Sequence, residues 1–269
     1  MVTVLDRIVA SKREEIAAAK KRRDLATLIQ AALQGPEIRS FIDALCGFDE
    51  VRLIAEVKRA SPSQGMIRPS FEPVQIALAY QAGGAAAISV LTDEPFFQGR
   101  LDYLTAIRNR VELPLLRKDF ILDEYQIYEA RAAGADAVLL IAECLEGKEL
   151  KDLYDLIIQL GMTALIELYN PVHLDRVLDT GTKLVGINNR DLHTFAVELD
   201  HVIRLRELIP NDVVVVAESG IFTAADVHKI KAGNVQAMLV GESLMRQPDV
   251  RQAVISLLQP PFGESSDPS

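Results

Sequence analysis

"LIAEVKRASPSQG" (residues 53–65) is a short apolar run that carries two charged residues at its end and then turns. Its aliphatic residues are typical of a parallel strand that is buried on both faces. Glu56 and Lys58 stand two residues apart, and because side chains alternate along a strand, both project to the same face. A buried charge needs a partner, so this stretch predicts that other strands bring polar groups to the same place.

Strand-length apolar runs like this one recur along the chain. They are RLIAEV (52–57), AAISVLT (86–92), LPLLRKDF (113–120), AVLLIAE (137–143), TALIEL (163–168), KLVGINN (183–189), VVVVAES (213–219) and QAMLVGES (236–243). The segments between them have apolar residues every three or four positions, which indicates helices. Alternating strands and helices predict an α/β fold with a parallel sheet, and eight such units in about 250 residues predict a (β/α)8 TIM barrel. An open doubly wound sheet is the alternative, but no Gly-x-Gly-x-x-Gly follows the first run.

Glycines precede five of the runs, at the points where helices should end: Gly83, Gly134, Gly161, Gly181 and Gly233. We expect them to adopt the left-handed conformation that closes a helix. Residues 1–47 precede the first run and read as one or two amphipathic helices, either packed on the barrel wall or forming a partial lid over one end. We expect one domain over residues 1–258, this extension included, and a disordered tail over 259–269.

Composition excludes several classes of protein. The formal net charge of −9 argues against a general affinity for nucleic acid or acidic membranes. Cys46 and Cys144 are too few for a disulfide framework, and no segment has the character of a signal peptide or a membrane span. The four histidines show no metal-ligand spacing with one another. We therefore expect a cytoplasmic monomer or weak homodimer with no metal and no cofactor.

Polar side chains end several of the apolar runs, where a core would reject them. They are Glu56 and Lys58, Lys118, Glu143, Glu167, Asn188 and Arg190, Glu218 and Ser219, and Glu242 and Ser243. In a TIM barrel these positions surround the end at which such enzymes place their chemistry. Alternation puts Lys118 on the face of Leu116 and Glu218 on the face of Val216, so both should point inward at the rim. Converging charges shift pKa values, and we expect the shift to make a lysine a usable proton donor near neutral pH. A ring of salt bridges that only holds the barrel end together is the bland alternative.

Glycines after the last two runs give a second signal. Ser219–Gly220 and Gly241–Glu242–Ser243 stand where barrel enzymes often bind phosphate with backbone N–H groups. Thr223 and Asp226 have the spacing of a capping box for the helix behind Gly220. Ordinary loop glycines would look the same. Ser61, in the turn after the first run, could add a hydroxyl donor or belong to a simple proline turn.

Six segments together resemble indole-3-glycerol-phosphate synthase, a tryptophan-pathway enzyme. They are IAEVKRASPSQGMI, LLRKDFILDEYQIYEARAAGADAVLLI, ALIELYN, VGINNRDL, VVAESGI and MLVGESLM. The similarity runs in order from about residue 4 to residue 256, and an extra N-terminal helical segment is also a trait of that family. The resemblance implies ring closure of 1-(2-carboxyphenylamino)-1-deoxyribulose 5-phosphate to indole-3-glycerol phosphate, with release of carbon dioxide and water.

The same resemblance implies roles for the predicted site. Lys118 would be the general acid that protonates the carbonyl oxygen, and Glu167 would serve the dehydration, positioned by Glu56 and Asn188 with Glu218 nearby. The sequence leaves open whether Lys58 or Lys118 protonates the departing hydroxyl. The phosphate would bind Ser61, Ser219, Gly220, Gly241 and the amides of Glu242 and Ser243, helped by Lys58 or Arg190. Lys58 would face the substrate carboxylate, and the apolar residues Phe97, Phe120, Leu139 and Leu192 would enclose the aromatic ring.

One departure from the family pattern is Glu242, where many relatives have serine. A carboxylate would repel a phosphate, so we expect its side chain to turn away. Three other functions stay open at this stage: a phosphate-binding isomerase barrel, a Schiff-base aldolase built on Lys118, and an inactive barrel that only binds a phosphorylated metabolite. The isomerase is disfavoured because that family uses a Cys/Asp pair, and no cysteine ends the first run here.

Overall fold

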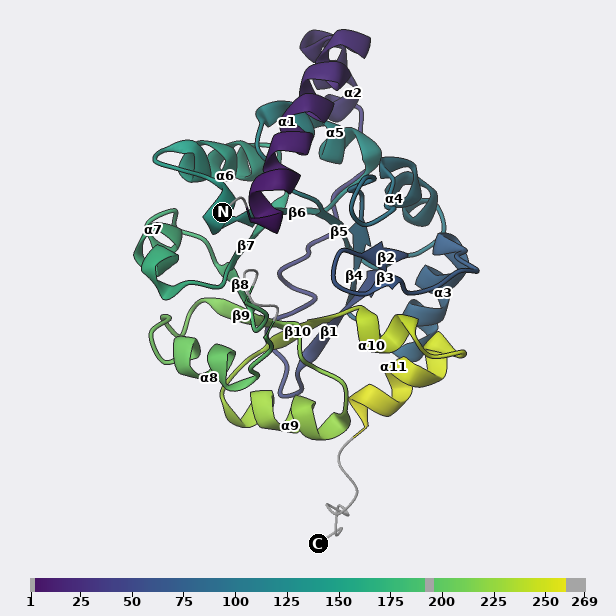
Figure 1. The fold of residues 1–269 in the computed structure, drawn as a ribbon, viewed down its shortest axis with the longest axis vertical. Coiled ribbons are helices and arrows are strands. Elements are labelled where there is room, and N and C mark those ends of the chain that lie inside the picture. The colour runs from purple at the N-terminus through teal and green to yellow at the C-terminus, as the bar shows by residue number, and fades with distance from the viewer. Residues whose placement is uncertain (1–2, 192–195, 260–269) are drawn as a thin grey trace, which may run out of the picture.

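Eight parallel strands close into a barrel surrounded by helices (Figure 1), in a computed structural model that describes residues 3–191 and 196–259. The order around the barrel is β1-β10-β9-β8-β7-β6-β5-β4. It closes where β1 (Arg52–Val57) pairs with β10 (Ala237–Val240) on one side and with β4 (Ala87–Leu91) on the other. Closure leaves no open sheet edge. The predicted (β/α)8 barrel is confirmed.

The remaining barrel strands alternate with helices along the chain. These strands are β5 (Leu115–Lys118), β6 (Ala137–Ile141), β7 (Thr163–Leu168), β8 (Leu184–Asn188) and β9 (Val214–Glu218). The helices outside the barrel are α3 (Pro73–Gly83), α4 (Leu101–Arg108), α5 (Glu124–Ala133), α6 (Glu149–Gln159), α7 (Leu174–Leu178), α8 (Asp200–Arg206), α9 (Ala224–Ala232), α10 (Glu242–Met245) and α11 (Val250–Leu258), with short 3-10 turns at η1 (Ala142–Cys144) and η2 (Pro171–His173). A small hairpin, β2 (Ala60–Ser61) and β3 (Gly65–Met66), follows β1. Across the described ranges, no helix is both long and apolar enough to cross a bilayer.

Alternate strand residues fill the barrel interior. Ile54, Leu116, Leu165 and Val216 are buried there in one apolar cluster. Each stands two residues before a charged residue of its own strand, namely Glu56, Lys118, Glu167 and Glu218. The predicted alternation therefore holds, and it points these charged groups into one end of the barrel, here called the mouth.

Six of the eight barrel strands end one to three residues before their apolar runs do. After Ile141 the chain turns into η1, and after Val240 it turns into α10, so Glu143 and Glu242 lie outside strands. The helix-ending glycines differ in a similar way. Gly134, Gly161 and Gly181 have left-handed backbones as predicted, but the left-handed residue after α3 is Gly84, and after α9 it is Asn234. Gly233 serves packing instead, since a Cβ there would lie 2.8 Å from Ile203.

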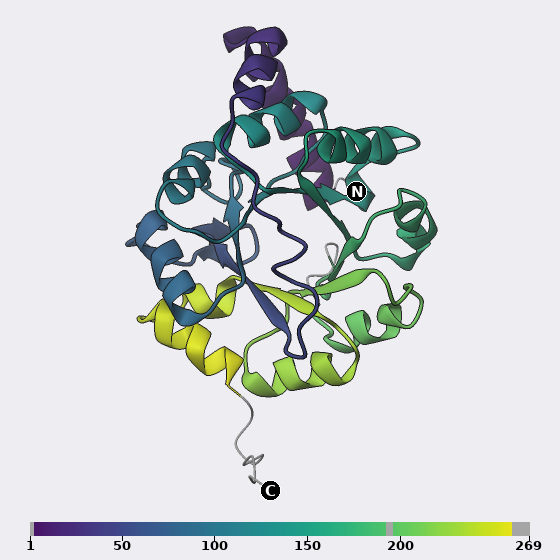
Figure 2. The same cartoon turned by 180° about the vertical axis from the view of Figure 1, so that it is seen from behind.

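The N-terminal extension contacts both ends of the barrel. Its first helix, α1 (Val4–Arg22), reaches the rim of the mouth with its N-terminal end and runs outward past α5, and α2 (Leu25–Leu33) packs against α5. The chain then crosses the opposite end, seen from behind in Figure 2, where Phe41 and Leu45 join the apolar cluster of the barrel interior. The N-terminal end of α1 therefore forms a partial lid at one side of the mouth, whereas α2 packs outside the barrel, so each alternative describes one part of the extension. The plug at the other end was not foreseen.

Candidate active site

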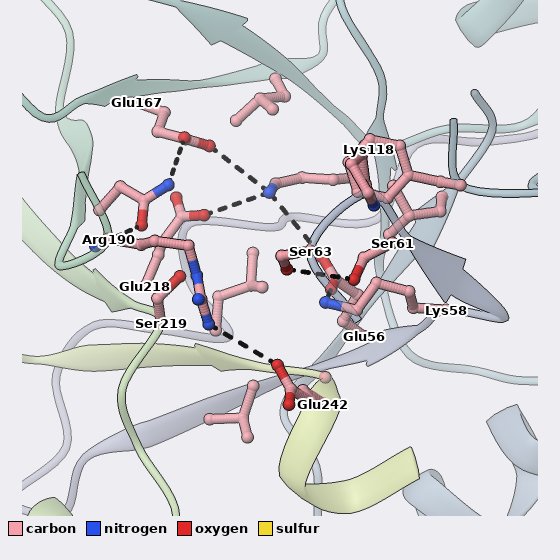
Figure 3. A pocket seen from close by; sticks show the side chains of 18 of the residues that line it. Glu56, Lys58, Ser61, Ser63, Lys118, Glu167, Arg190, Glu218, Ser219 and Glu242 are labelled. Carbon is pink, nitrogen blue, oxygen red and sulfur yellow. Dashed lines mark hydrogen bonds and ion pairs between the residues drawn. The ribbon is translucent and has the colours of Figure 1, made fainter. Parts of the chain in front are cut away.

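Lys118 lies at the centre of a cavity at the mouth (Figure 3). Its ammonium is 3.3 Å from Glu218 Oε2, 3.4 Å from Glu167 Oε2 and 3.8 Å from Glu56 Oε2. These glutamates end or nearly end β9, β7 and β1, so three separate strands deliver them to one point. Ammonium–carboxylate hydrogen bonds are usually about 2.7–2.9 Å long. The ion pairs of Lys118 are longer, which leaves its ammonium able to bind a further acceptor.

The surrounding carboxylates fix the charge on Lys118. Burial alone would lower the pKa of its ammonium, but Glu167, Glu218 and Glu56 together raise the pKa above its ordinary value. The sequence analysis expected the shift to make a lysine a proton donor near neutral pH. The pKa of Lys118 is raised instead, so its side chain is held as a protonated ammonium.

The pKa of Glu218 is raised, which favours the neutral form of this carboxyl. Burial, followed by the negative charge of Glu167, raises the pKa of Glu218 to about 8. Its Oε1 is buried and has no hydrogen-bond partner among residues 3–191 and 196–259. Gly186 on β8 makes room for it, because a Cβ at that position would overlap Glu218 Oε1. At pH 7 Glu218 is mostly protonated and can donate a proton.

Glu56 and Lys58, the pair in the opening stretch, are each other's partners. Lys58 Nζ is 2.6 Å from Glu56 Oε1. Burial opposes ionisation of Glu56, but Lys58 and Lys118 outweigh it and lower the pKa of this carboxyl. Gly241 packs directly on the pair, since a Cβ there would lie 2.6 Å from Glu56 Oε1. In the described part of the chain Glu56 contacts the two lysines and reaches Glu167 only through Lys118, so its expected role in positioning Glu167 stays a prediction.

Asn188 connects Glu167 to Arg190. The Asn188 side-chain amide donates to Glu167 Oε1 at 3.0 Å, which is the contact that the sequence analysis expected. Its Oδ1 accepts from the backbone N–H of Arg190, also at 3.0 Å. One side chain at the end of β8 therefore orients the carboxylate and the turn that carries the arginine.

Arg190 faces Glu242 across the mouth, 3.6 Å from its carboxylate (Figure 3). Arg246 contacts the same carboxylate at 3.2 Å. The Glu242 side chain thus lies toward the cavity and not away from it, contrary to expectation. Two arginines neutralise it there, so its charge is less repulsive to an anion than the sequence alone indicated.

The loop after β9 has an unusual backbone. Ser219 and Gly220 both adopt left-handed conformations, with φ of 65° and 79°. For serine this conformation is strained, and such strain is concentrated at functional sites. Ser243 donates its hydroxyl to the Ile221 carbonyl at 3.0 Å, which ties the loop to α10. The predicted capping box of Thr223 and Asp226 is present at the start of α9. On the opposite side, Ser61 Oγ accepts from the backbone N–H of Gln64 within the β2–β3 hairpin.

Two phenylalanines form one side of the cavity and are here called the aromatic wall. Phe97 and Phe120 lie with ring centroids 6.1 Å apart. Leu139, on β6, lines the same cavity. All the predicted site residues line this cavity except Leu192, which falls outside the described residues. Glu143 is elsewhere and accepts from the backbone N–H groups of Tyr169 and Asn170.

The helix α1 contributes Val4, Leu5 and Ile8 to the cavity. The sequence analysis allowed for a lid from this segment but named none of these residues, and it did not predict Ser63 and Asp119, which also line the cavity. One signal was available: Lys12 stands four residues after Ile8 and four before Ile16, and therefore interrupts the apolar stripe of the helix. A lysine in a buried stripe predicts a carboxylate partner on the surface that the helix covers.

Comparisons of sequence place the chain in one family. The profile described as Indole-3-glycerol phosphate synthase matches residues 5–257. The indole-3-glycerol phosphate synthase of Rhodopirellula baltica is 57% identical over 257 residues, covering 96% of this chain and 99% of the relative. That of Paracidovorax citrulli is 48% identical over 264 residues, covering 96% and 99%.

Solved structures that resemble this chain share its barrel fold. The N-acetylmannosamine-6-phosphate 2-epimerase of Clostridium perfringens superposes with a TM-score of 0.60 at 16% identity, covering 77% of this chain and 92% of the epimerase. A 3-hexulose-6-phosphate synthase gives a TM-score of 0.62 at 14% identity, covering 77% and 98%. At such low identity these similarities support the fold and say nothing of the reaction.

Proposed function

The chain belongs to the indole-3-glycerol phosphate synthase family of decarboxylating lyases in tryptophan biosynthesis, and we propose how its side chains carry out that reaction. The substrate, 1-(2-carboxyphenylamino)-1-deoxyribulose 5-phosphate, loses carbon dioxide and water as the indole ring closes. The observation that carries the proposal is the position of Lys118, whose ammonium lies among three carboxylates from separate strands.

In the first step, the ring carbon that bears the carboxylate attacks the ketose carbonyl. We place the carbonyl oxygen against Lys118 Nζ, whose long ion pairs leave it open to another acceptor. The raised pKa of Lys118 does not prevent it from acting as the acid, because an alkoxide forming on the substrate is a stronger base than an amine. The ammonium stabilises the developing charge and then transfers its proton as the carbon–carbon bond forms.

Loss of carbon dioxide then returns the bonding electrons to the ring and restores its aromaticity. The following dehydration needs a base for a proton on the carbon beside the nitrogen and an acid for the leaving hydroxyl. Glu167, held by Asn188, is the proposed base. Glu218, with its pKa of about 8, joins Lys118 and Lys58 as a candidate acid, since it carries a proton at neutral pH.

The substrate's anionic groups would occupy the two sides of the mouth. We propose that the phosphate binds the loops at Ser219–Gly220 and 241–243, with Arg190 exchanging part of its contact with Glu242 for the phosphate. The substrate carboxylate would face Lys58. The benzoate ring would rest on the aromatic wall of Phe97 and Phe120, with Leu139 nearby.

The test is product formation by the purified chain, followed by indole fluorescence, in the wild type and in Glu167→Gln. We expect wild-type turnover and a loss of about 10²–10⁴-fold in kcat for Glu167→Gln, with affinity for indole-3-glycerol phosphate retained. Glu143→Gln is the matched control, because Glu143 follows a neighbouring strand but contacts only the backbone of Tyr169 and Asn170 in the described structure. Equal activity in Glu167→Gln and Glu143→Gln would remove Glu167 from the mechanism.

We further propose that the enzyme works in the cytoplasm as a monomer or weak homodimer, on a diffusing phosphorylated substrate and with neither nucleic acid nor membrane as partner. The net charge of −9 supports the absence of polyanionic partners. Sedimentation of the purified chain at micromolar concentration tests the oligomeric part of this proposal.

A further inference from the structure

A buried lysine of the N-terminal helix contacts the two loops that carry the aromatic wall. We propose that this residue, Lys12, is a positioning residue that sets the geometry of Phe97 and Phe120 through Asp93 and Asp119. The inference rests on the proposed function, because it assigns the aromatic wall to the ring of the substrate. Lys12 itself does not line the cavity and is not a catalytic residue.

Lys12 is held by three carboxylates at short distances. Its ammonium is 2.8 Å from Glu15 Oε2, 2.9 Å from Asp93 Oδ2 and 3.0 Å from Asp119 Oδ1. Glu15 belongs to the same helix, but Asp93 follows β4 and Asp119 follows β5. The lysine therefore joins α1 to two neighbouring barrel loops, and its side chain is only 4% exposed.

Asp93 connects Lys12 to Phe97. Its Oδ1 accepts from the backbone N–H groups of Phe96 at 2.9 Å and Phe97 at 3.2 Å. Its other oxygen, Oδ2, is buried without a hydrogen-bond partner in the described part of the chain, so the Lys12 ammonium is the group that compensates it. Loss of that ammonium would leave a buried charge directly beneath the turn that carries Phe97.

Asp119 connects Lys12 to Phe120 in the same way. Its Oδ1, which contacts Lys12, also accepts from the backbone N–H of Phe120 at 2.8 Å. Its Oδ2 accepts from Thr92 at 2.5 Å and from Arg117 at 3.3 Å, so Asp119 keeps partners of its own when Lys12 is removed. The loop would then keep its contacts to Thr92 and Arg117 and lose the one that joins it to α1.

The helix also adds apolar contacts to the cavity itself. Ile8, one turn before Lys12 on the same face, lines the cavity together with Leu5. The Lys12 ammonium therefore holds together the helix that carries Leu5 and Ile8 and the two loops that carry the aromatic wall. Lys118, in contrast, is the last residue of β5 and is held by the barrel ladder. Removing Lys12 should loosen ring binding and leave the reacting ammonium in place.

The experiment compares Lys12→Met with Lys20→Met. Lys20 lies in the same helix and forms an ion pair with Asp123, but neither residue lines the cavity. For Lys12→Met we expect KM and the Kd for indole-3-glycerol phosphate to rise about 10- to 100-fold, with kcat changed by less than about threefold. The Kd for inorganic phosphate should stay at the wild-type value. Lys20→Met should match the wild type in all of these.

Several outcomes would overturn the inference. A folded Lys12→Met with wild-type affinity for indole-3-glycerol phosphate would do so, and so would an equal loss of affinity for inorganic phosphate. If Lys12→Met does not fold, Asp93→Asn replaces it: the amide oxygen can still accept from Phe96 and Phe97, while the charge facing Lys12 is gone. Unchanged product affinity in Asp93→Asn would then refute the role of the ion pair. Absence of turnover in the wild type would instead refute the proposed function.

Discussion

Lys12 and Lys118 are each surrounded by three carboxylates, and they differ in how closely those carboxylates approach. The contacts of Lys12 measure 2.8, 2.9 and 3.0 Å, whereas those of Lys118 measure 3.3, 3.4 and 3.8 Å. The Lys12 side chain is 4% exposed and that of Lys118 is 16% exposed. The first cluster is closed around its cation, and the second is held open.

Protonation separates the two clusters further. Near Lys12, the pKa of Asp119 is lowered, because Arg117 and Lys12 together outweigh its burial. Near Lys118, the pKa of Glu218 is raised to about 8. A closed cluster with ionised partners is the arrangement expected of a structural ion pair. An open cluster in which one carboxyl stays protonated is less favourable for stability than a closed one. Such unfavourable arrangements are expected where substrates bind.

Replacing each lysine by methionine should show the largest difference between the two clusters. For Lys118→Met we expect kcat to fall about 10²–10⁴-fold, because the general acid is lost. For Lys12→Met we expect the free energy of unfolding to fall by about 3–5 kcal/mol, since Asp93 is left buried and unpaired. Lys118→Met should lose less stability, because Lys58 still compensates Glu56, Asn188 still donates to Glu167, and the raised pKa of Glu218 already favours its neutral form. Urea unfolding and steady-state kinetics on both variants provide the measurement.

The reverse pattern would contradict this reading. If Lys118→Met proved the less stable variant while Lys12→Met lost the larger part of kcat, the open cluster would be the structural one. Far-UV circular dichroism of both variants, recorded before the assays, separates misfolding from lost chemistry.

The protonated state of Glu218 predicts that the stability of the protein depends on pH, with an effect of intermediate size. With a pKa of about 8 in the folded protein and an ordinary value of 4.5, the folded state binds more protons than the unfolded state between these pH values. Its contribution to stability is therefore complete below about pH 4.5 and is lost as the pH rises toward 8. Glu218→Gln imitates the protonated form and lacks this loss.

Thermal unfolding from pH 5 to pH 8.5 tests it. The wild type and Glu218→Gln should differ little at pH 5, and the variant should become the more stable of the two at pH 8.5, by a few kcal/mol at most. Glu50→Gln, at an exposed glutamate far from the cavity, should follow the wild type. A constant difference across this range would show that Glu218 is ionised throughout.

The barrel and the convergence of its charged residues could be predicted from sequence, because both follow from strand alternation. Once Ile54 is assigned to the interior, Glu56 must point the same way, and the strand order carries it to the mouth. The bounds of β1 and β7 are those of the apolar runs. The roles of two glycines were harder to predict from sequence. Gly241 and Gly186 leave space beside Glu56 and Glu218, and neither is needed for a turn.

The sign of the pKa shift on Lys118 could not be predicted. Burial and neighbouring carboxylates act in opposite directions, and their balance depends on distances between residues that are far apart in sequence. Lys12 was overlooked for a related reason. A lysine in an amphipathic helix is normally exposed, and only the positions of Asp93 and Asp119 make it a buried partner.

The ion pair of Lys20 and Asp123 tests whether distance or burial decides how much such a pair stabilises the protein, and its expected effect is the smallest. Their contact, at 2.7 Å, is shorter than any that Lys12 makes, but their side chains are 43% and 28% exposed. Water and salt screen such a pair, so Lys20→Met should cost only about 0.2–1 kcal/mol, and less in 1 M salt. Urea unfolding of Lys20→Met beside Lys12→Met, at low and high salt, measures both. If Lys20→Met proved as destabilising as Lys12→Met, distance and not burial would decide the strength of these pairs, and the contrast between the closed and open clusters would need another cause.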